Sequence, residues 1–333
     1  MMQAKSMSEP DFARHGGRID DALAAYPDAP RPWIDLSTGI NPVPWPVPKG
    51  LLVDPAPLPS TAALADLEQI AACHFGVEAR HVAAVPGSEI ALRLLPMLGV
   101  PLPIVAAVPS YGTHREVASE AVALAEVDRV RGGTLLIANP NNPDGRLLDR
   151  AALHKLAMRQ AERGGWLVVD EAFADTDPAP SIPAVGEDAP VIAMRSFGKF
   201  FGLAGIRLGF IIAPPMVIAA LRGLLGDWPV SAQAIGWGRA AYADREWIEA
   251  TRIALVERAR RLDAMLARHG LSARGASPLF RLVEHPDARA IFERLGRAGI
   301  LTRPFVDRAD WLRFGLPADD GAFGRLDRAL ARG

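Results

Sequence analysis

The sequence VIAMRSFGKFFGLAGIRLGFIIA, residues 191–213, places one lysine between two apolar runs. The first run ends at Ser196, and the second follows Arg207. Between them, Lys199 lies among phenylalanines and glycines. Removal from water lowers the pKa of a lysine amine and makes the amine a nucleophile towards an aldehyde. The segment therefore predicts two buried strands joined by a turn that carries a reactive lysine.

Similar short apolar runs recur upstream of this segment. They lie at residues 82–85, 103–108, 134–138 and 166–170. Helical patterns separate them, at 61–75, at 90–98 and after Arg146. Short apolar runs that alternate with helices are typical of strands buried on both faces of a parallel sheet. We therefore expect an α/β fold with a mainly parallel sheet.

The two ends of the chain differ from this middle part. Residues 1–59 are rich in proline and glycine, as in NPVPWPVPKG at 41–50, so we expect an N-terminal arm without long helices or central strands. Residues 60–230 form the predicted large domain. In residues 231–333, longer amphipathic helices at 232–242 and 247–269 accompany strand candidates at 279–283 and 311–315, which predicts a small α+β domain.

Composition narrows the range of partners. The 333 residues include 37 basic and 38 acidic ones, which gives a net charge of -1 and no electrostatic footprint for nucleic acid. No secretory leader and no apolar run long enough to cross a membrane is visible. The single cysteine, Cys73, predicts neither a disulfide nor a zinc site. We expect a cytoplasmic protein with a small-molecule ligand and no metal.

Polar residues follow several predicted strands, where ligands of open α/β sheets bind. Gly87 and Ser88 follow the first strand and offer N–H groups and a hydroxyl to a phosphate, although a plain helix cap is the more common meaning of this pattern. Tyr111 and His114 lie three residues apart, hence on one helix face. The tyrosine ring suits a planar ligand, or else the protein core.

Two further strand ends carry an amide and a carboxylate. Asn142 lies in the turn NPNNPDG and supplies an amide donor beside a fixed backbone. Asp170 and Glu171 end a buried strand, where an unpaired carboxylate is costly and needs a cationic partner. Pyridoxal 5′-phosphate (PLP) requires a lysine, an acid, an aromatic ring and donors to its phosphate and phenolic oxygen. The combination therefore predicts a PLP site.

These motifs resemble those of fold type I PLP enzymes, the aspartate aminotransferase superfamily, from about Asp35 to the C-terminus. The motifs PSYGTH, NPNNPDG, DEAF and SFGKFFGLAGIRLG each have a counterpart there. The resemblance implies catalytic roles for Lys199 as the Schiff-base lysine, Asp170 at the pyridine nitrogen, Tyr111 on the ring and His114 behind the acid. It further implies that Asn142 binds the phenolic oxygen, and that the phosphate is bound by Gly87, Ser88, Ser196 and Arg207. Arg313 in WLRFG would hold the substrate α-carboxylate.

Within the superfamily, the sequence most resembles the threonine-phosphate decarboxylases of cobalamin biosynthesis. His15-Gly16-Gly17 and IDLSTGINP at 34–42 are similar to the opening motifs of these enzymes, and Phe173 stands where aminotransferases usually carry a tyrosine. The resemblance implies decarboxylation of L-threonine O-3-phosphate to 1-amino-2-propanol O-2-phosphate. His15 and Asn41 are the candidates for binding the substrate phosphate.

Other outcomes remain open from the sequence. A histidinol-phosphate or other amino-acid aminotransferase would use the same cofactor residues, and a non-catalytic module with a PLP fold would keep them without turnover. The resemblance also implies a homodimer, since active sites of this superfamily generally lie at a subunit boundary. The tyrosine that relatives send across the dimer would fall near Pro59, where this chain has none.

Overall fold

The computed structural model describes Phe12, residues 14–182 and residues 190–331. It divides into two compact units. We call Met1–Gly39, Ala259–Arg274 and Phe280–Gly333 the terminal unit, and Ile40–Arg258 and Gly275–Leu279 the central unit. The arm and the two domains with boundaries near 59 and 230 stay a prediction about how the chain folds.

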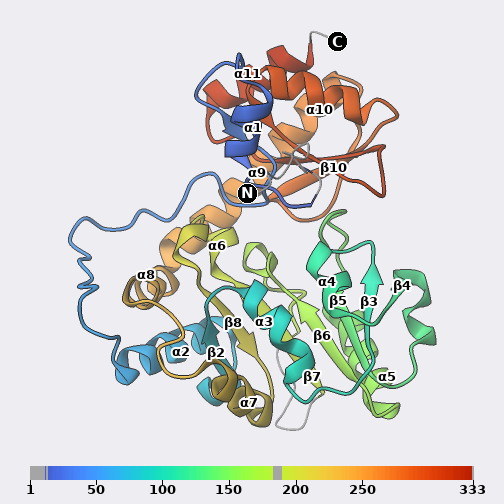
Figure 1. Cartoon of the computed structure of the whole chain (residues 1–333). Helices are drawn as coiled ribbons and strands as arrows, with labels where there is room; N and C mark the ends of the chain where they lie inside the picture. The colour runs from blue at the N-terminus through green and yellow to red at the C-terminus, as the bar shows by residue number, and fades with distance from the viewer. Residues whose placement is uncertain (1–11, 13, 183–189, 332–333) are drawn as a thin grey trace, which may run out of the picture. The chain divides into compact units, whose positions relative to one another are not determined.

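A seven-stranded sheet forms the middle of the central unit (Figure 1). Neighbouring strands pair in parallel except for β8, which is antiparallel to both its neighbours. The mainly parallel α/β architecture expected from the sequence is thus confirmed. In spatial order the strands are β2 (Val82–Val85), β8 (Gly209–Ile212), β7 (Val191–Ser196), β6 (Trp166–Asp170), β5 (Thr134–Ala138), β3 (Ile104–Val108) and β4 (Glu120–Ala123).

Alternate residues of the strands serve two separate layers of core. On one face, Leu136 and Val168 pack with residues of α3 and α7; on the other, Leu135 and Leu167 pack with residues of α5. Because both faces of the sheet are buried, the sequences of these strands are continuous runs of apolar residues. The helices of this unit are α2 (Thr61–Phe75), α3 (Ser88–Leu94), α4 (Gly112–Val117), α5 (Arg150–Glu162), α6 (Phe197–Phe200), α7 (Pro215–Leu225) and α8 (Ala232–Ala243).

Local signals set where these helices begin and end. The Ser60 side chain accepts a hydrogen bond from the Ala63 amide at the start of α2, and Gly76 ends the helix at a φ of 71°. The helix predicted at 90–98 is α helical only to Leu94, because Pro96 has no N–H to donate. The 3-10 segments are η1 (Ala79–His81), η2 (Leu95–Met97), η3 (Leu124–Arg129), η4 (Ala174–Thr176) and η5 (Ala204–Ile206).

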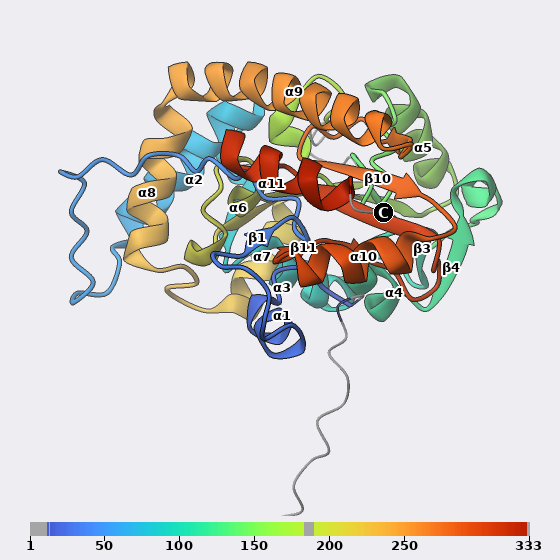
Figure 2. The same cartoon turned by 90° about the horizontal axis from the view of Figure 1, so that it is seen from above.

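The terminal unit joins both ends of the chain. The short strand β1 (Ile34–Asp35) pairs in parallel with β11 (Ile300–Leu301), and the rings of Phe12 and Phe292 lie 5.5 Å apart. A four-stranded antiparallel sheet has the order β12 (Arg303–Pro304), β13 (Trp311–Gly315), β10 (Phe280–Glu284) and β9 (Ala273–Arg274). Helices α10 (Ala288–Arg297) and α11 (Asp320–Leu330) pack side by side in this unit, which also contains α1 (Ile19–Ala25) (Figure 2).

Helix α9 (Arg245–Arg268) contributes residues to both units, with the division falling after Arg258. It is the longest helix that the structure describes, and its charged residues interrupt any apolar stretch. Within the described residues, no helix has the length and apolar character needed to cross a membrane.

Candidate active site

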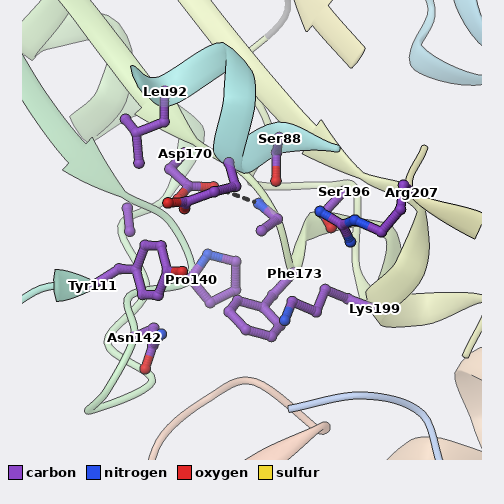
Figure 3. Close-up of a pocket in the computed structure, with 13 residues that line it drawn as sticks. Ser88, Leu92, Tyr111, Pro140, Asn142, Asp170, Phe173, Ser196, Lys199 and Arg207 are labelled. Carbon is purple, nitrogen blue, oxygen red and sulfur yellow. Dashed lines mark hydrogen bonds between the residues drawn. The ribbon is translucent and has the colours of Figure 1, made fainter. Parts of the chain in front are cut away.

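A pocket of about 240 Å³ opens where parallel strands of the central sheet end (Figure 3). Tyr111 and Asn142 lie on one side of it in this view, and Ser88, Ser196 and Arg207 lie on the other. Seven of the residues predicted from the sequence line it together. The full lining is Ser88, Glu89, Leu92, Tyr111, Ala138, Pro140, Asn142, Asp170, Ala172, Phe173, Ser196, Lys199 and Arg207.

Asp170 is held at the end of β6 by two hydrogen bonds. Its Oδ2 atom lies 3.0 Å from His114 Nε2, and its Oδ1 atom accepts a hydrogen bond of 3.1 Å from the Ala172 amide. His114 is completely buried. A buried histidine behind the carboxylate fixes the direction in which Asp170 faces the pocket, as the sequence motif predicted for this pair.

Tyr111 precedes α4 and presents its ring to the pocket (Figure 3). Burial raises the pKa of the Tyr111 hydroxyl to about 12, and the nearby charge of Glu89 contributes in the same direction. The hydroxyl therefore stays protonated at neutral pH. The ring of His114 meets the Tyr111 ring edge-on at 6.0 Å between centroids.

Lys199 lies in α6, the single helical turn that follows β7. Its side chain reaches the pocket, where Nζ lies 5.8 Å from the centre of the Phe173 ring (Figure 3). Phe173 is buried and belongs to the turn after Asp170. The amine and the carboxylate thus come from adjacent parallel strands, which explains their separation in the sequence.

Two hydroxyls and a guanidinium meet on the side of the pocket that contains Ser88. Gly87 has a φ of 87°, and a Cβ atom added to it would collide with the Arg207 guanidinium. Arg207 itself adopts a left-handed backbone with φ 56° and donates a hydrogen bond of 3.1 Å to the Ala204 carbonyl. The absence of a side chain at Gly87 lets the Arg207 guanidinium lie close to the backbone that precedes Ser88. This group of donors fits a phosphate.

The turn after β5 leaves Asn142 in the pocket. The Asn139 side chain bonds both the amide and the carbonyl of Leu148, while Asn141 Nδ2 donates to the Pro109 carbonyl. These two asparagines hold the turn, and Asn142 lines the pocket with little exposure. Of the three asparagines in the motif, Asn139 and Asn141 therefore stabilise the turn, and Asn142 lines the pocket.

The remaining predicted residues lie apart from the pocket lining. Arg313 is buried on β13 of the terminal unit and donates a hydrogen bond of 2.7 Å to the Ser37 carbonyl. The Gly17 amide donates to Ser37 Oγ at 2.8 Å, so the segment that follows His15 also contacts Ser37. Within this unit, the two N-terminal motifs and Arg313 meet around one serine.

Asn41 belongs to the central unit and is buried against α6. Its Nδ2 atom donates to the Phe200 carbonyl at 2.9 Å, and its Oδ1 atom accepts a hydrogen bond from the Val43 amide. The sequence assigned Asn41 to a substrate phosphate, and these contacts with the backbone were not foreseen.

Glu89 lines the pocket but was not selected from the sequence. Its Oε1 atom accepts hydrogen bonds from Thr113 Oγ1 at 3.0 Å and from Arg93 Nε at 2.7 Å. Its position next to Ser88 was the available signal, but an acid in the first turn of a helix is common for electrostatic reasons alone. The hydrogen bond from Thr113 to Glu89 forms only in the folded chain, so the sequence could not show that Glu89 lines the pocket.

Glu171 has the cationic partner that its burial requires. Arg195 Nε lies 3.0 Å from Glu171 Oε2, and Arg195 Nη1 donates to Asp175 at 2.9 Å. All three side chains are buried. Glu171 and Asp175 precede and follow Phe173 in the sequence, so Arg195 connects the two ends of the turn that carries Phe173.

The family model for aminotransferase class I and II matches residues 81–321. Over 327 residues, the chain is 41% identical to a threonine-phosphate decarboxylase of Sinorhizobium sp, with 96% of this chain and 97% of the relative covered. A threonine-phosphate decarboxylase of Pseudomonas aeruginosa is 38% identical over 324 residues, with 95% and 96% covered.

Among solved structures, histidinol-phosphate aminotransferase from Sinorhizobium meliloti in complex with pyridoxal-5′-phosphate superimposes with a TM-score of 0.83. The alignment covers 100% of this chain and 98% of that one, at 23% sequence identity. At this identity the likeness establishes the fold. The expected PLP-dependent transferase-like architecture is therefore confirmed.

Proposed function

This chain belongs to the aminotransferase class I and II family, and from that premise we propose that it decarboxylates L-threonine O-3-phosphate. The product is 1-amino-2-propanol O-2-phosphate, which assigns the enzyme to cobalamin biosynthesis. The observation that carries the proposal is the similarity to two threonine-phosphate decarboxylases, at 38% and 41% identity over nearly the whole of each chain. Phe173 in the pocket is consistent with it.

The residues of the pocket fit PLP. Lys199 would supply the amine for the aldehyde, Asp170 with His114 behind it would favour a protonated pyridine nitrogen, and Tyr111 would pack on the ring. Asn142 would donate to the phenolic oxygen, and the phosphate would be bound where Arg207 approaches Gly87. Ser88 and Ser196 supply the two hydroxyls there.

When bound, PLP would supply an electron sink for the pair of the bond that breaks at the substrate Cα. The protein determines which bond that is. Arg313, whose planar fork suits a carboxylate, holds the group that leaves as carbon dioxide. Lys199 Nζ lines the same pocket and would be the group that returns a proton to the substrate Cα in place of the carboxylate.

The substrate phosphate needs cationic or N–H donors. His15 remains the candidate from the N-terminal motif. Asn41, the second candidate from the sequence, has its side chain bonded to the Phe200 carbonyl and the Val43 amide. We further propose that the enzyme is a cytoplasmic homodimer. The proline-rich segment 42–59 supports the dimer, because it exposes 89% of Leu52 and 66% of Leu58.

The test compares two activities of the purified, PLP-loaded protein. Incubation with L-threonine O-3-phosphate should release carbon dioxide at a rate proportional to enzyme, without any 2-oxo acid. Incubation with histidinol phosphate and 2-oxoglutarate should give no glutamate above background. Turnover of the second pair without release of carbon dioxide from the first would identify an aminotransferase and overturn the proposal.

A further inference from the structure

Three consecutive backbone carbonyls around Lys199 accept hydrogen bonds from the segment 41–45. The Asn41 amide donates to the Lys199 carbonyl, the Asn41 side chain to the Phe200 carbonyl, and the Trp45 amide to the Phe201 carbonyl, each at 2.9 Å. Asn41, Trp45, Phe200 and Phe201 are all buried. The segment 41–45 therefore supplies hydrogen-bond donors to the last carbonyls of the turn that carries the lysine.

The helix α6 needs such partners because it consists of residues 197–200 alone. The last carbonyls of a helix have no partner within it, and in a helix of one turn they make up the whole backbone. In the buried surroundings of Phe200, water cannot take their place, and an unsatisfied carbonyl there costs free energy. The backbone position of Lys199 therefore depends on residues more than 150 positions away in the sequence.

The segment 41–45 is itself fixed against α6. Gly202 has a φ of 69°, and a Cβ atom added to it would lie 2.7 Å from Pro44 Cα and 2.8 Å from the Asn41 carbonyl oxygen. Trp45 Nε1 donates a hydrogen bond of 2.9 Å to Asp244 Oδ2 at the end of α8. The close backbone contact at Gly202 leaves Asn41 little room to move, and the bond to Asp244 attaches only the far end of the segment.

We propose that Asn41 is a positioning residue for Lys199, holding α6 through the Phe200 carbonyl. Its Oδ1 atom accepts from the Val43 amide, so the same side chain also shapes the segment from which it acts. The inference rests on the proposed role of Lys199 as the residue that carries PLP. It gives Asn41 a task distinct from contact with the substrate phosphate.

The experiment uses the PLP-loaded enzyme and the variants Asn41→Ala and Asn41→Asp. The first readout is the pH titration of the visible cofactor absorbance. Its midpoint gives the pKa of the linkage between PLP and Lys199, and it needs no substrate. The second is the division of the kinetic effect between kcat and KM for L-threonine O-3-phosphate. In Asn41→Ala we expect a displaced titration midpoint and a fall in kcat of about tenfold or more, because small misplacements of a reacting group are expensive.

Under the proposal, KM for L-threonine O-3-phosphate stays within about twofold, because the lost contact is not with the substrate. The matched control is Trp45→Phe, which removes the bond to Asp244 but leaves the backbone contact of residue 45 with Phe201. It should lower thermal stability without displacing the titration midpoint. A midpoint displaced equally in both variants would mean a general loosening of the fold and would overturn the proposal.

If Asn41→Ala raises KM strongly while kcat and the titration stay at wild-type values, Asn41 contacts substrate and the proposal is wrong. Should Asn41→Ala fail to fold, Asn41→Asp decides, because it keeps the size and the acceptor for Val43 but cannot donate to Phe200. Wild-type titration in Asn41→Asp would overturn the proposal. The titration needs PLP alone, so a failure of the decarboxylation assay would count against the proposed function and leave this result to stand.

Discussion

Lys199 is a residue at which cofactor attachment can be separated from folding. In Lys199→Ala we expect the visible absorbance of the bound cofactor to disappear, because alanine offers no amine to the aldehyde. Lys199 is only half-buried, so the melting temperature of the protein without cofactor should change by no more than a few degrees. Absorbance spectra and thermal melts of both proteins measure this. A variant with the wild-type absorbance band and full turnover would exclude Lys199 from its role.

Phe173 is the second residue whose substitution is informative. Its ring centre lies 5.8 Å from Lys199 Nζ, and the resemblance to the family motif implies a place near the cofactor's phenolic oxygen. In Phe173→Tyr, an added hydroxyl donates to that oxygen and stabilises its deprotonated form, so the pKa of the cofactor-lysine linkage should fall. Titration of the visible absorbance in both proteins measures the change.

The same variant should remain a decarboxylase. The choice of bond depends on how the carboxylate and the phosphate are held, and the phenolic contact leaves both unchanged. Carbon dioxide and keto-acid formation, measured together, test this. If Phe173→Tyr made transamination the main reaction, residue 173 would be the switch, and the importance given to Arg313 would be misplaced.

Sequence reasoning succeeded for residues that directly follow a buried strand. Asp170, Ser196 and Lys199 could be placed in one pocket because parallel strands end at the same edge. It missed Glu89 and the backbone contacts of Asn41, since neither has a local pattern. Those contacts exist only once α4 and the segment 41–45 have been brought to their neighbours by the fold.

At the scale of elements, strands β6 and β7 are tied together by charge as well as by their ladder. Arg195 bonds Asp175 and Ser181 at 2.9 Å and 2.8 Å and lies 3.0 Å from Glu171. In Arg195→Met, two buried carboxylates lose this partner, and we expect a loss of about 3–5 kcal/mol in the free energy of unfolding at pH 7. Urea denaturation measures the loss.

The loss should shrink at acid pH. Burial alone would raise the pKa of Asp175, but His74 and Arg195 outweigh it and hold this pKa below its usual range. A carboxylate with a lowered folded pKa stabilises the fold above its unfolded pKa and loses that contribution as pH falls through the folded value. Wild type and Arg195→Met should therefore converge only below about pH 4, as pH falls through the lowered pKa of Asp175. An unchanged difference would show that Arg195 acts by packing alone.

Arg222→Met is the matched control for the ionic cluster. Arg222 pairs with Glu68 at the β2 edge of the same sheet, but its side chain is 55% exposed. Water can replace most of this pairing, so the expected loss is smaller, about 1 kcal/mol or less. Only Arg195→Met should also disturb the cofactor absorbance, because only its partners lie on either side of Phe173.

Helices and strands with a regular pattern of apolar residues could be predicted from the sequence. Strands that depend on pairing with a distant segment could not. The predicted strand 82–85 has the bounds of β2, and the predicted helix 61–75 has the bounds of α2. Both depend on signals within a few residues, namely apolar side chains and helix-capping residues. Strand β1 has two residues and exists only because β11 pairs with it. The same holds for the unit that joins residues 1–39 to the C-terminal part, since contacts across such distances in sequence leave no periodic trace.

At the scale of the whole molecule, exposed apolar side chains support the proposed homodimer. Leu52 and Leu58 are 89% and 66% exposed in a segment whose prolines already restrict its conformation. Ordering such a segment against a partner costs little entropy. We expect the protein to sediment at twice its chain mass of 35.6 kDa at micromolar concentration.

The double variant Leu52→Asp, Leu58→Asp tests which surface forms the dimer. Two charges buried without partners in an interface are expensive, so the variant should dissociate to monomers while its circular dichroism spectrum stays that of the folded chain. Val306→Asp, at a residue that is 75% exposed in the terminal unit, is the matched control and should remain dimeric. If the double variant stays dimeric, the segment 42–59 is not the interface. If the wild-type protein is an active monomer, the homodimer itself is wrong, and the missing tyrosine near Pro59 would have a simple explanation, since no neighbouring site would need it.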